Sequence, residues 1–183
     1  MEKRKIVFIA PEFYDYHKII TAKLKELFGE TFFFPERKTN WLYNILNNIH
    51  PKLINLYQKI YFFFIWKQLK KEKNITDFFV IRGYKMPVFF IKNLKKKYPN
   101  IRTIMYQWDS LRNNSYEYLI PYFDKSYTFD YKDFEQEYYL EAYFSNIPKP
   151  IFKAEKALQD IIDRLLKESI TDKNMDFFRD KLE

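Results

Sequence analysis

Short apolar runs alternate with helical repeats through the first 130 residues. Five runs have the length of single strands: residues 3–11, 31–34, 75–83, 101–108 and 125–130. Five segments carry apolar residues at helical spacing: 16–28, 41–50, 53–71, 87–97 and 116–123. Strands that alternate with helices at this interval predict βαβ units, because parallel strands need crossover helices that cover the sheet. The expected fold is α/β, a single Rossmann-like parallel sheet with helices on both faces.

The pattern changes at the segment NIPKP, residues 146–150, where two prolines interrupt it. Just before it we expect a short helix over 132–137 and an extended segment over 138–144. After it the apolar spacing predicts two helices, 154–169 and 173–182, and no strand. We therefore expect a Rossmann-like domain over residues 3–145 and a C-terminal helical tail, 146–183, that packs on it.

Composition excludes several classes of site. The chain has no cysteine, which rules out disulfides, thiolate zinc sites and a cysteine nucleophile. His17 and His50 are its two histidines, too few for a histidine-rich metal site. We expect neither a metal nor a cofactor. The N-terminus, MEKRKIVFIAP, lacks the long apolar segment and cleavage site of a secretion signal. The expected location is cytoplasmic, with attachment to the inner face of the membrane as an additional interpretation.

The net charge of +8 is unevenly distributed along the chain. Residues 38–102 contain 14 Lys and Arg against 2 Asp and Glu, whereas residues 109–141 contain 8 acids against 3 bases. The basic region should attract anions, and the acidic region should not. Basic residues with interleaved aromatics also occur in nucleic-acid-binding proteins, but no recognisable nucleic-acid module is present. We therefore do not expect a nucleic-acid partner.

Polar side chains gather where the predicted strands end. In a parallel sheet these ends meet at one edge, where open α/β proteins bind their ligands. The candidate substrate-binding residues at this edge are Glu12, His17, Arg82, Gly83, Trp108, Asp109, Ser110, Arg112, Asn113 and Asp130. Structural roles are open as well, since Asp109 and Ser110 could cap the next helix, Arg82 could pair with Asp109, and Gly83 could serve only as a turn.

Two kinds of catalytic or nucleotide site are disfavoured by the residues themselves. The chain has two glycines, Gly29 and Gly83, so it contains neither a Walker loop nor a G-x-G-x-x-G turn. No nucleophile-elbow sequence is present to support a Ser-His-Asp triad. The sequence assigns no catalytic residue.

Residues 53–71 form a second candidate, a surface for membranes. Their apolar run IYFFFIW is seven residues long, whereas a membrane-spanning helix needs roughly 20. Basic residues flank it, and an aromatic helix with basic flanks can lie on an anionic membrane. The candidate contacts are Lys67, Lys70 and Lys71. The competing interpretation, which the pattern favours, is a buried helix of the α/β core.

The sequence resembles the N-terminal half of bacterial GT-B-type glycosyltransferase-like proteins of lipopolysaccharide and other surface-polysaccharide biosynthesis. The likeness covers residues 3–145 and lies in four segments: KRKIVFIAPEFYDYHKIITAKLKELFG, DFFVIRG, IRTIMYQWDSLRNN and YFDKSYTFDYKDFE. Its most specific elements are Arg82-Gly83, the Trp108-Asp109-Ser110 turn with Asn113, Phe123-Asp124, and Thr128-Phe129-Asp130.

In GT-B enzymes two Rossmann-like domains face each other, and the N-terminal domain generally receives the acceptor. The resemblance implies that Arg82, Trp108, Asp109, Ser110 and Asp130 line the acceptor side, with a nucleotide sugar or a glycan acceptor as ligand. We expect no second set of strands after Asn146, so the domain would be inactive alone and a partner chain would supply the nucleotide-sugar domain. The alternative is a non-catalytic module that binds an anionic membrane surface or a protein.

Overall fold

A computed structural model of the chain describes residues 4–128, 130 and 141–142. The chain divides into two compact units, Met1–Glu141 and Ala142–Glu183, and nearly all the described residues belong to the first. The elements are β1 (Arg4–Ala10), α1 (Tyr16–Phe28), β2 (Gly29–Pro35), α2 (Trp41–Ile49), α3 (Pro51–Leu69), β3 (Asp77–Ile81), α4 (Val88–Lys97), β4 (Arg102–Gln107), η1 (Glu117–Tyr122), β5 (Lys125–Thr128) and β6 (Glu141–Ala142).

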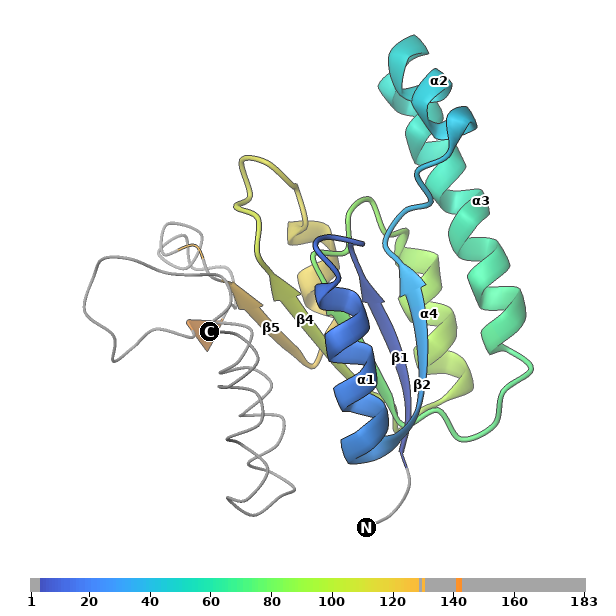
Figure 1. The fold of residues 1–183 in the computed structure, drawn as a ribbon, viewed down its shortest axis with the longest axis vertical. Helices are drawn as coiled ribbons and strands as arrows, with labels where there is room; N and C mark the ends of the chain where they lie inside the picture. The colour runs from blue at the N-terminus through green and yellow to red at the C-terminus, as the bar shows by residue number, and fades with distance from the viewer. Residues whose placement is uncertain (1–3, 129, 131–140, 143–183) are drawn as a thin grey trace. The chain divides into compact units, whose positions relative to one another are not determined.

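The strands form one sheet in the order β2-β1-β3-β4-β5-β6, and β1 to β5 run parallel (Figure 1). The chain goes from β1 to β2 on one side, and then crosses back to place β3 on the other side of β1. In open α/β sheets this reversal marks the point where ligands bind, at the carboxyl ends of the strands. The predicted α/β class with a parallel sheet is confirmed.

Helices cover both faces of the sheet (Figure 1). Successive side chains of a strand point to opposite faces, so Val7 and Phe8 face different layers. Val7 belongs to a hydrophobic core in which Phe62 of α3 and Phe90 of α4 are fully buried. On the other face Phe8 stacks on Phe79 with 5.3 Å between ring centroids, on the side of the sheet that α1 covers.

One predicted helix differs from the structure in its type, and another differs in its first residue. The predicted helix at 116–123 is a 3-10 helix, η1, because Pro121 lies inside it and cannot donate an α-helical hydrogen bond. The predicted helix at 53–71 begins earlier, at Pro51, where the His50 side chain accepts a hydrogen bond from the Lys52 N–H at 3.1 Å. Of the predicted extended segment 138–144, residues 141–142 form β6, and the predicted helices at 132–137, 154–169 and 173–182 lie outside the described residues.

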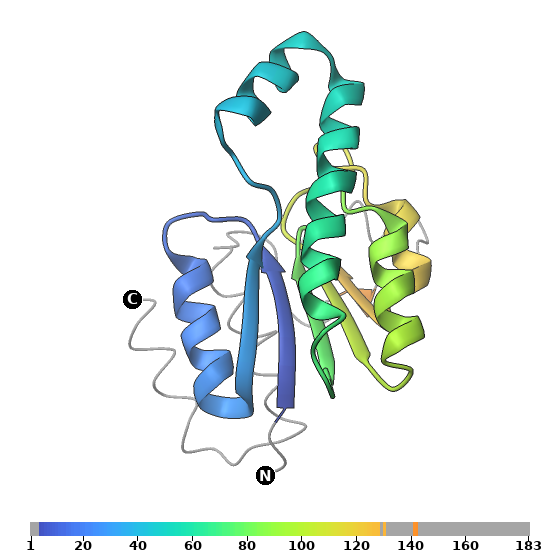
Figure 2. The same cartoon turned by 90° about the vertical axis from the view of Figure 1, so that its right-hand side faces the viewer.

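The connection from β2 to β3 forms a helical hairpin of α2 and α3 that projects beyond the carboxyl edge of the sheet (Figure 2). Asn40 caps α2, since its side chain accepts a hydrogen bond from the Tyr43 N–H at 2.9 Å. Part of α3 packs on the sheet through buried residues, and the rest supports α2. A long crossover that starts at the carboxyl edge thus places new surface next to the predicted ligand site.

Candidate functional site

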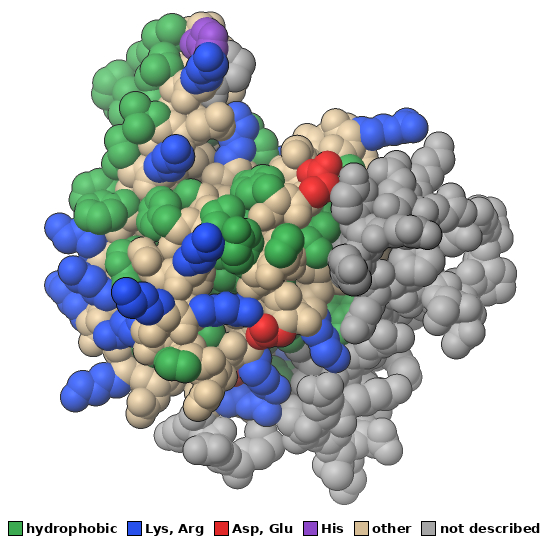
Figure 3. Space-filling view, turned by 180° about the vertical axis from the view of Figure 1, so that it is seen from behind, with side chains coloured by type: hydrophobic (Ala, Val, Ile, Leu, Met, Phe, Trp, Pro, Cys, Tyr) green, Lys and Arg blue, Asp and Glu red, His purple; other side chains and the backbone are tan. Residues whose placement is uncertain are grey.

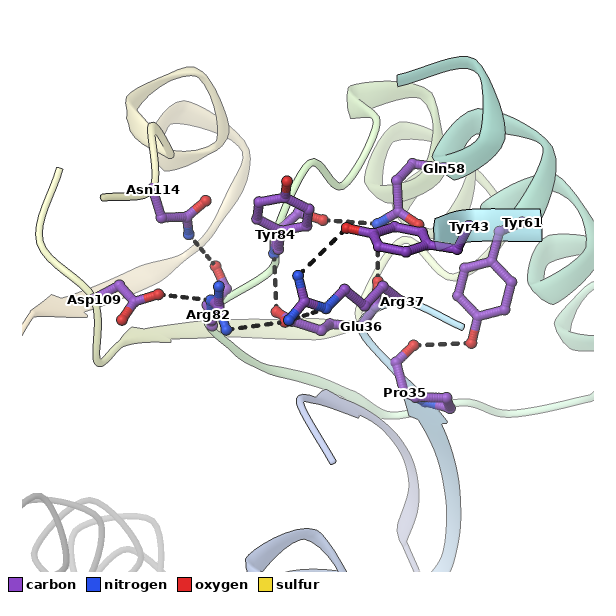
Figure 4. Close-up of polar contacts among 10 residues, drawn as sticks. All are labelled: Pro35, Glu36, Arg37, Tyr43, Gln58, Tyr61, Arg82, Tyr84, Asp109 and Asn114. Atoms are coloured by element: carbon purple, nitrogen blue, oxygen red, sulfur yellow. Dashed lines mark hydrogen bonds and ion pairs between the residues drawn. The ribbon is translucent and has the colours of Figure 1, made fainter. Parts of the chain in front are cut away.

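Four charged side chains, which follow β2, β3 and β4, meet at the carboxyl edge of the sheet (Figure 4). Arg82 follows β3, and its Nε lies 2.7 Å from Oδ2 of Asp109, which is in the loop after β4. The same guanidinium approaches Glu36, which follows β2, with 3.3 Å between Nη1 and Oε1. The ion pair of Arg82 with Asp109, one of the structural roles open from the sequence, is confirmed. Arg37 also approaches Glu36, with 3.9 Å between Nε and Oε1, so two cations and two carboxylates compensate one another within the protein.

Glu36 belongs to this cluster and is absent from the residues predicted from the sequence. Its side chain is 0% exposed. Burial raises the pKa of Glu36, and the Arg82 charge and the Tyr84 N–H, which donates to Oε2 at 3.2 Å, oppose that rise without cancelling it. The sequence does contain a clue, because Glu36 directly follows the strand that ends at Pro35. Its meeting with Arg82 depends on the strand order, which the sequence did not reveal.

The backbone that carries Arg82 is held in an uncommon conformation. Arg82 and Gly83 have φ of 72° and 62°, in the left-handed region. The Arg82 N–H donates to the carbonyl of Tyr106 at 2.8 Å, and the Asn114 amide donates to the carbonyl of Arg82 at 3.2 Å. A Cβ on Gly83 would lie 3.1 Å from Cγ1 of Val80, so glycine suits both the angle and the space.

The asparagine that contacts Arg82 is Asn114, and the predicted Asn113 is exposed beside it. Both backbone N–H groups donate to the carbonyl of Ser110, at 2.9 Å for Asn113 and 3.0 Å for Asn114, which folds this segment into a tight turn. Ser110 is partly exposed and Arg112 is exposed. The turn therefore presents polar groups to solvent and buries one amide against the β3 loop.

Helix α3 is tied to the same edge through its inner face. The Gln58 amide donates to the carbonyls of Glu36 and Tyr84, both at 3.0 Å. The Tyr61 hydroxyl donates to the carbonyl of Pro35 at 2.9 Å (Figure 4). The hairpin, the end of β2 and the loop after β3 are thus joined by hydrogen bonds among buried and partly buried groups, which makes the edge a defined arrangement.

Aromatic side chains from two loops meet above the end of β3. The Phe13 ring, 52% exposed, makes an edge contact with Tyr14, which is 80% exposed, at 4.4 Å between centroids. Phe13 also approaches the Trp108 ring at 6.3 Å. Phe13 and Tyr14 follow β1 and Trp108 follows β4, and β3 lies between those strands. The contact therefore bridges the point where the strand order reverses.

Backbone strain gathers in these loops. Five described non-glycine residues have positive φ, and four follow β1 or β3: Tyr14 (40°), Asp15 (59°), Arg82 (72°) and Lys85 (49°). The fifth, Asn74, precedes β3. Such conformations cost on the order of 1–3 kcal/mol each and concentrate at functional sites. The carboxyl edge is therefore the part of the described fold where a ligand site is best supported.

The other predicted residues occupy varied places. His17 is largely buried and stacks on Phe33 with 5.0 Å between ring centroids, so its ring is directed at the sheet. Glu12 is exposed in the loop after β1. Its carboxylate acts on Tyr61 of α3: burial raises the pKa of the Tyr61 phenol, and the negative charge of Glu12 raises that pKa further. Asp130 is partly exposed, and its N–H donates to the Thr128 hydroxyl at 3.1 Å.

Helix α3 combines the two interpretations of residues 53–71. Phe62 is fully buried in the core, as a core helix requires, whereas Phe63 and Phe64 are 49% and 55% exposed. The three candidate lysines are exposed: Lys67, Lys70 and Lys71. One face of the helix is therefore core and another is open to solvent.

Among the residues that the structure describes, no group of three or more acidic or histidine side chains could hold a metal ion. Within the same residues, no helix has both the length and the apolarity needed to cross a bilayer.

Comparison with known proteins gives one distant match. No protein-family model matches the sequence, and no curated protein matches it significantly. A solved structure from Burkholderia pseudomallei K96243, described as a pilus assembly-related protein, aligns with 93% of this chain and 96% of its own, at 8% sequence identity and a TM-score of 0.34. A likeness of this size carries no argument about fold or function.

Proposed function

We propose that this protein is a glycosyltransferase-like domain that binds the glycan acceptor in lipopolysaccharide or capsular polysaccharide biosynthesis. The observation that carries the proposal is the aromatic group at the edge where the strand order reverses: Phe13 and Tyr14 are exposed, and partly exposed Trp108 directly precedes Asp109. Aromatic rings bind the C–H faces of sugars, and a few fixed polar groups bind the hydroxyls.

The electrostatics of the edge favour a hydroxyl-rich ligand over a diphosphate. Both arginines of the cluster are already engaged: Arg82 is paired with Glu36 and Asp109, and Arg37 lies 3.9 Å from Glu36. A nucleotide sugar needs uncompensated cations or backbone N–H groups for its phosphates, and the loop after β1 has side chains where a glycine turn would bind them. This supports assigning acceptor binding to the domain and leaving nucleotide-sugar binding to a partner chain.

Each residue then has a defined role. Trp108 and Phe13 provide stacking surfaces. Asp109, with a side chain 29% exposed, accepts hydrogen bonds from sugar hydroxyls through the oxygen that does not pair with Arg82. Arg82 and Glu36 are positioning residues that hold Asp109 in place. These roles are in binding, and none of the residues is assigned a catalytic role.

A glycan array of lipopolysaccharide-core and capsular oligosaccharides tests the proposal. We expect a subset of the glycans to bind, and titration calorimetry should show about fivefold to thirtyfold weaker binding for Trp108→Ala and for Phe13→Ala, because a lost stacking ring removes on the order of 1–2 kcal/mol. Ile19→Ala, at an apolar side chain on α1 that is 40% exposed, is the matched control. No glycan binding, or binding that survives both edge substitutions, would contradict the proposal.

A thermal-shift screen with UDP-, GDP- and CMP-linked sugars tests whether nucleotide-sugar binding requires a partner chain. We expect these donors to stabilise the protein only when a partner chain that supplies the donor side is present. A clear rise in melting temperature for the protein alone would show that this chain binds donors, and would refute the acceptor-only assignment.

The alternative function, a membrane-surface or protein-interaction module, concerns a different part of the fold. Its candidate surface is the α2–α3 hairpin, whose exposed residues are distinct from the ring cluster of the carboxyl edge. The two surfaces can therefore be tested separately.

A further inference from the structure

The α2–α3 hairpin carries most of the exposed apolar surface of the described residues. Of their twelve exposed large hydrophobic side chains, eight lie on it. On α2 these are Trp41 (73%), Leu42 (38%), Ile45 (45%) and Ile49 (64%). On α3 they are Leu56 (55%), Ile60 (50%), Phe63 (49%) and Phe64 (55%). Contiguous exposed apolar surface on a folded protein marks an interaction site.

The exposed side chains form a stripe on each helix. On α2, Trp41, Ile45 and Ile49 are spaced four residues apart and therefore share one face. On α3, at 100° per residue, the exposed apolar side chains and the three lysines of the helix fall within an arc of roughly 140°. The opposite side of α3 contains Ile54, Phe62 and Ile65, which are buried. The outer face of α3 is thus both apolar and basic.

The charge of the hairpin has a single sign. Residues 37–71 contain seven Lys and Arg and no Asp or Glu. Figure 3 shows hydrophobic and basic side chains intermixed over the projecting hairpin. Lys67 illustrates the mixing, since its ammonium lies 5.9 Å from the centre of the exposed Phe63 ring. An occupant of this surface must accept apolar groups and positive charges at the same positions.

An anionic bilayer surface meets both requirements better than a protein does. The cores of protein interfaces are depleted of lysine, because a buried ammonium needs an individual partner. At a membrane, apolar side chains enter the boundary of the acyl chains while lysine stems bend toward the phosphates above them. Tryptophan also favours this boundary, and Trp41 is the most exposed apolar side chain of the hairpin.

We infer that the α2–α3 hairpin docks the protein on an anionic lipid surface, with the exposed stripes of both helices at the headgroup boundary. The seven-residue apolar run alone is not the docking element, because Phe62 and Ile65 within it are core residues. The docking surface instead combines the outer face of α3 with the stripe on α2. The inference is independent of glycan binding and would hold if the carboxyl edge bound no sugar.

Vesicle sedimentation with the full chain tests the inference. We compare vesicles of phosphatidylcholine alone with vesicles that contain about 30% phosphatidylglycerol, and expect binding to the anionic vesicles that weakens at high salt. The triple variant Lys59→Gln, Lys67→Gln, Lys70→Gln should lower the partition coefficient on the order of 100-fold, since each lysine near an anionic surface contributes about fivefold to tenfold. The double variant Phe63→Ser, Phe64→Ser should lower it at least tenfold.

Matched controls separate docking from general charge and hydrophobicity. The triple variant Lys25→Gln, Lys96→Gln, Lys97→Gln removes the same charge from exposed positions outside the hairpin and should change binding less than threefold. Ile19→Ser is the apolar control, and circular dichroism checks that every variant is folded. Trp41 gives a second readout, because its fluorescence should shift to the blue with anionic vesicles and the shift should be lost in Trp41→Phe.

Three results would overturn the inference. Equal binding to neutral and anionic vesicles would remove the role of charge. Equal losses in the hairpin and control lysine variants would show that the attraction is not local. Absence of vesicle binding, together with self-association that Phe63→Ser abolishes, would identify the hairpin as an interface between copies of the chain.

Discussion

Replacing Arg82 by methionine removes the charge that lies between Glu36 and Asp109 but keeps a side chain of similar length. The substitution also keeps the Cβ that the left-handed backbone at φ 72° already accommodates, so backbone strain does not change. Removal of one partner from a buried ion pair costs about 3–5 kcal/mol, because the other charge stays buried without compensation. Arg82 keeps 20% of its side chain exposed, and the fully buried Glu36 keeps a weaker contact with Arg37 at 3.9 Å. We therefore expect a loss at the lower end of this range, about 3 kcal/mol at pH 8.

The loss should depend on pH, and its sign follows from Glu36. Burial already raises the pKa of Glu36, and the Arg82 charge limits that rise. Without Arg82 the pKa of Glu36 rises further, so the folded protein holds a proton that the unfolded chain releases. Such a group loses stability as the pH increases from its unfolded pKa through its folded pKa. Arg82→Met should therefore lower the free energy of unfolding less at pH 5 than at pH 8.

Urea unfolding followed by tryptophan fluorescence at the two pH values measures this effect. The double variant Arg82→Met, Glu36→Gln removes the orphaned charge and should recover at least half of the loss at pH 8. A loss below about 1 kcal/mol at pH 8 would refute the assigned burial of the pair. A loss that is equal at both pH values, or that the double variant does not recover, would refute the role of Glu36.

Three further predictions concern other parts of the fold. Phe62→Ala should cost about 3–5 kcal/mol in urea unfolding, whereas Phe64→Ala, at a side chain 55% exposed, should cost less than about 0.5 kcal/mol; similar losses would contradict the orientation of α3. Gly83→Ala should cost about 1–2 kcal/mol, since φ is 62° and the added Cβ would crowd Val80; an unchanged melting temperature would count against the turn geometry. Burial raises the pKa of Asp124, but the hydrogen bonds that it accepts from a lysine and a threonine outweigh burial and hold that pKa below its ordinary value. The stability that the ionised Asp124 contributes is present above its unfolded pKa and is lost as the pH falls through its folded pKa. Since the side chain is 49% exposed, Asp124→Asn should lower the free energy of unfolding by at most about 1 kcal/mol at pH 7 and by nearly nothing at the acid end of the titration. A loss that is the same at every pH would contradict this.

Most secondary structure could be predicted from the sequence because it depends on local spacing. The apolar run at 3–11 and the helical repeat at 16–28 correspond to β1 and α1. The prediction for η1 was less accurate, because Pro121 changes the hydrogen-bond pattern without disturbing the apolar spacing. Helix α3 shows a further limit, since a run of consecutive apolar residues cannot indicate which of them face the core.

The candidate site was predictable in part. Arg82 lies at the end of one predicted strand and Asp109 follows another, and a parallel sheet brings such residues to one edge, where the structure pairs them. Glu36 and Asn114 were missed for two reasons. For Glu36, the local sequence pattern does not indicate that β2 lies beside β1. For Asn114, the sequence does not show which of two adjacent asparagines the turn buries. The roles of the aromatic group and of the hairpin are proposals that the experiments above decide.

The sequence by itself determined the α/β class, the element boundaries to within a few residues, and the edge at which the polar strand ends gather. These properties follow from the spacing of apolar residues along the chain and from the fact that parallel strands share a carboxyl edge. The tertiary structure alone decided which charges meet, that Glu36 is buried against Arg82, and that the outer face of α3 remains open to solvent. Those features arise from contacts between residues far apart in the sequence, where strand order and desolvation, and not local spacing, set the energy.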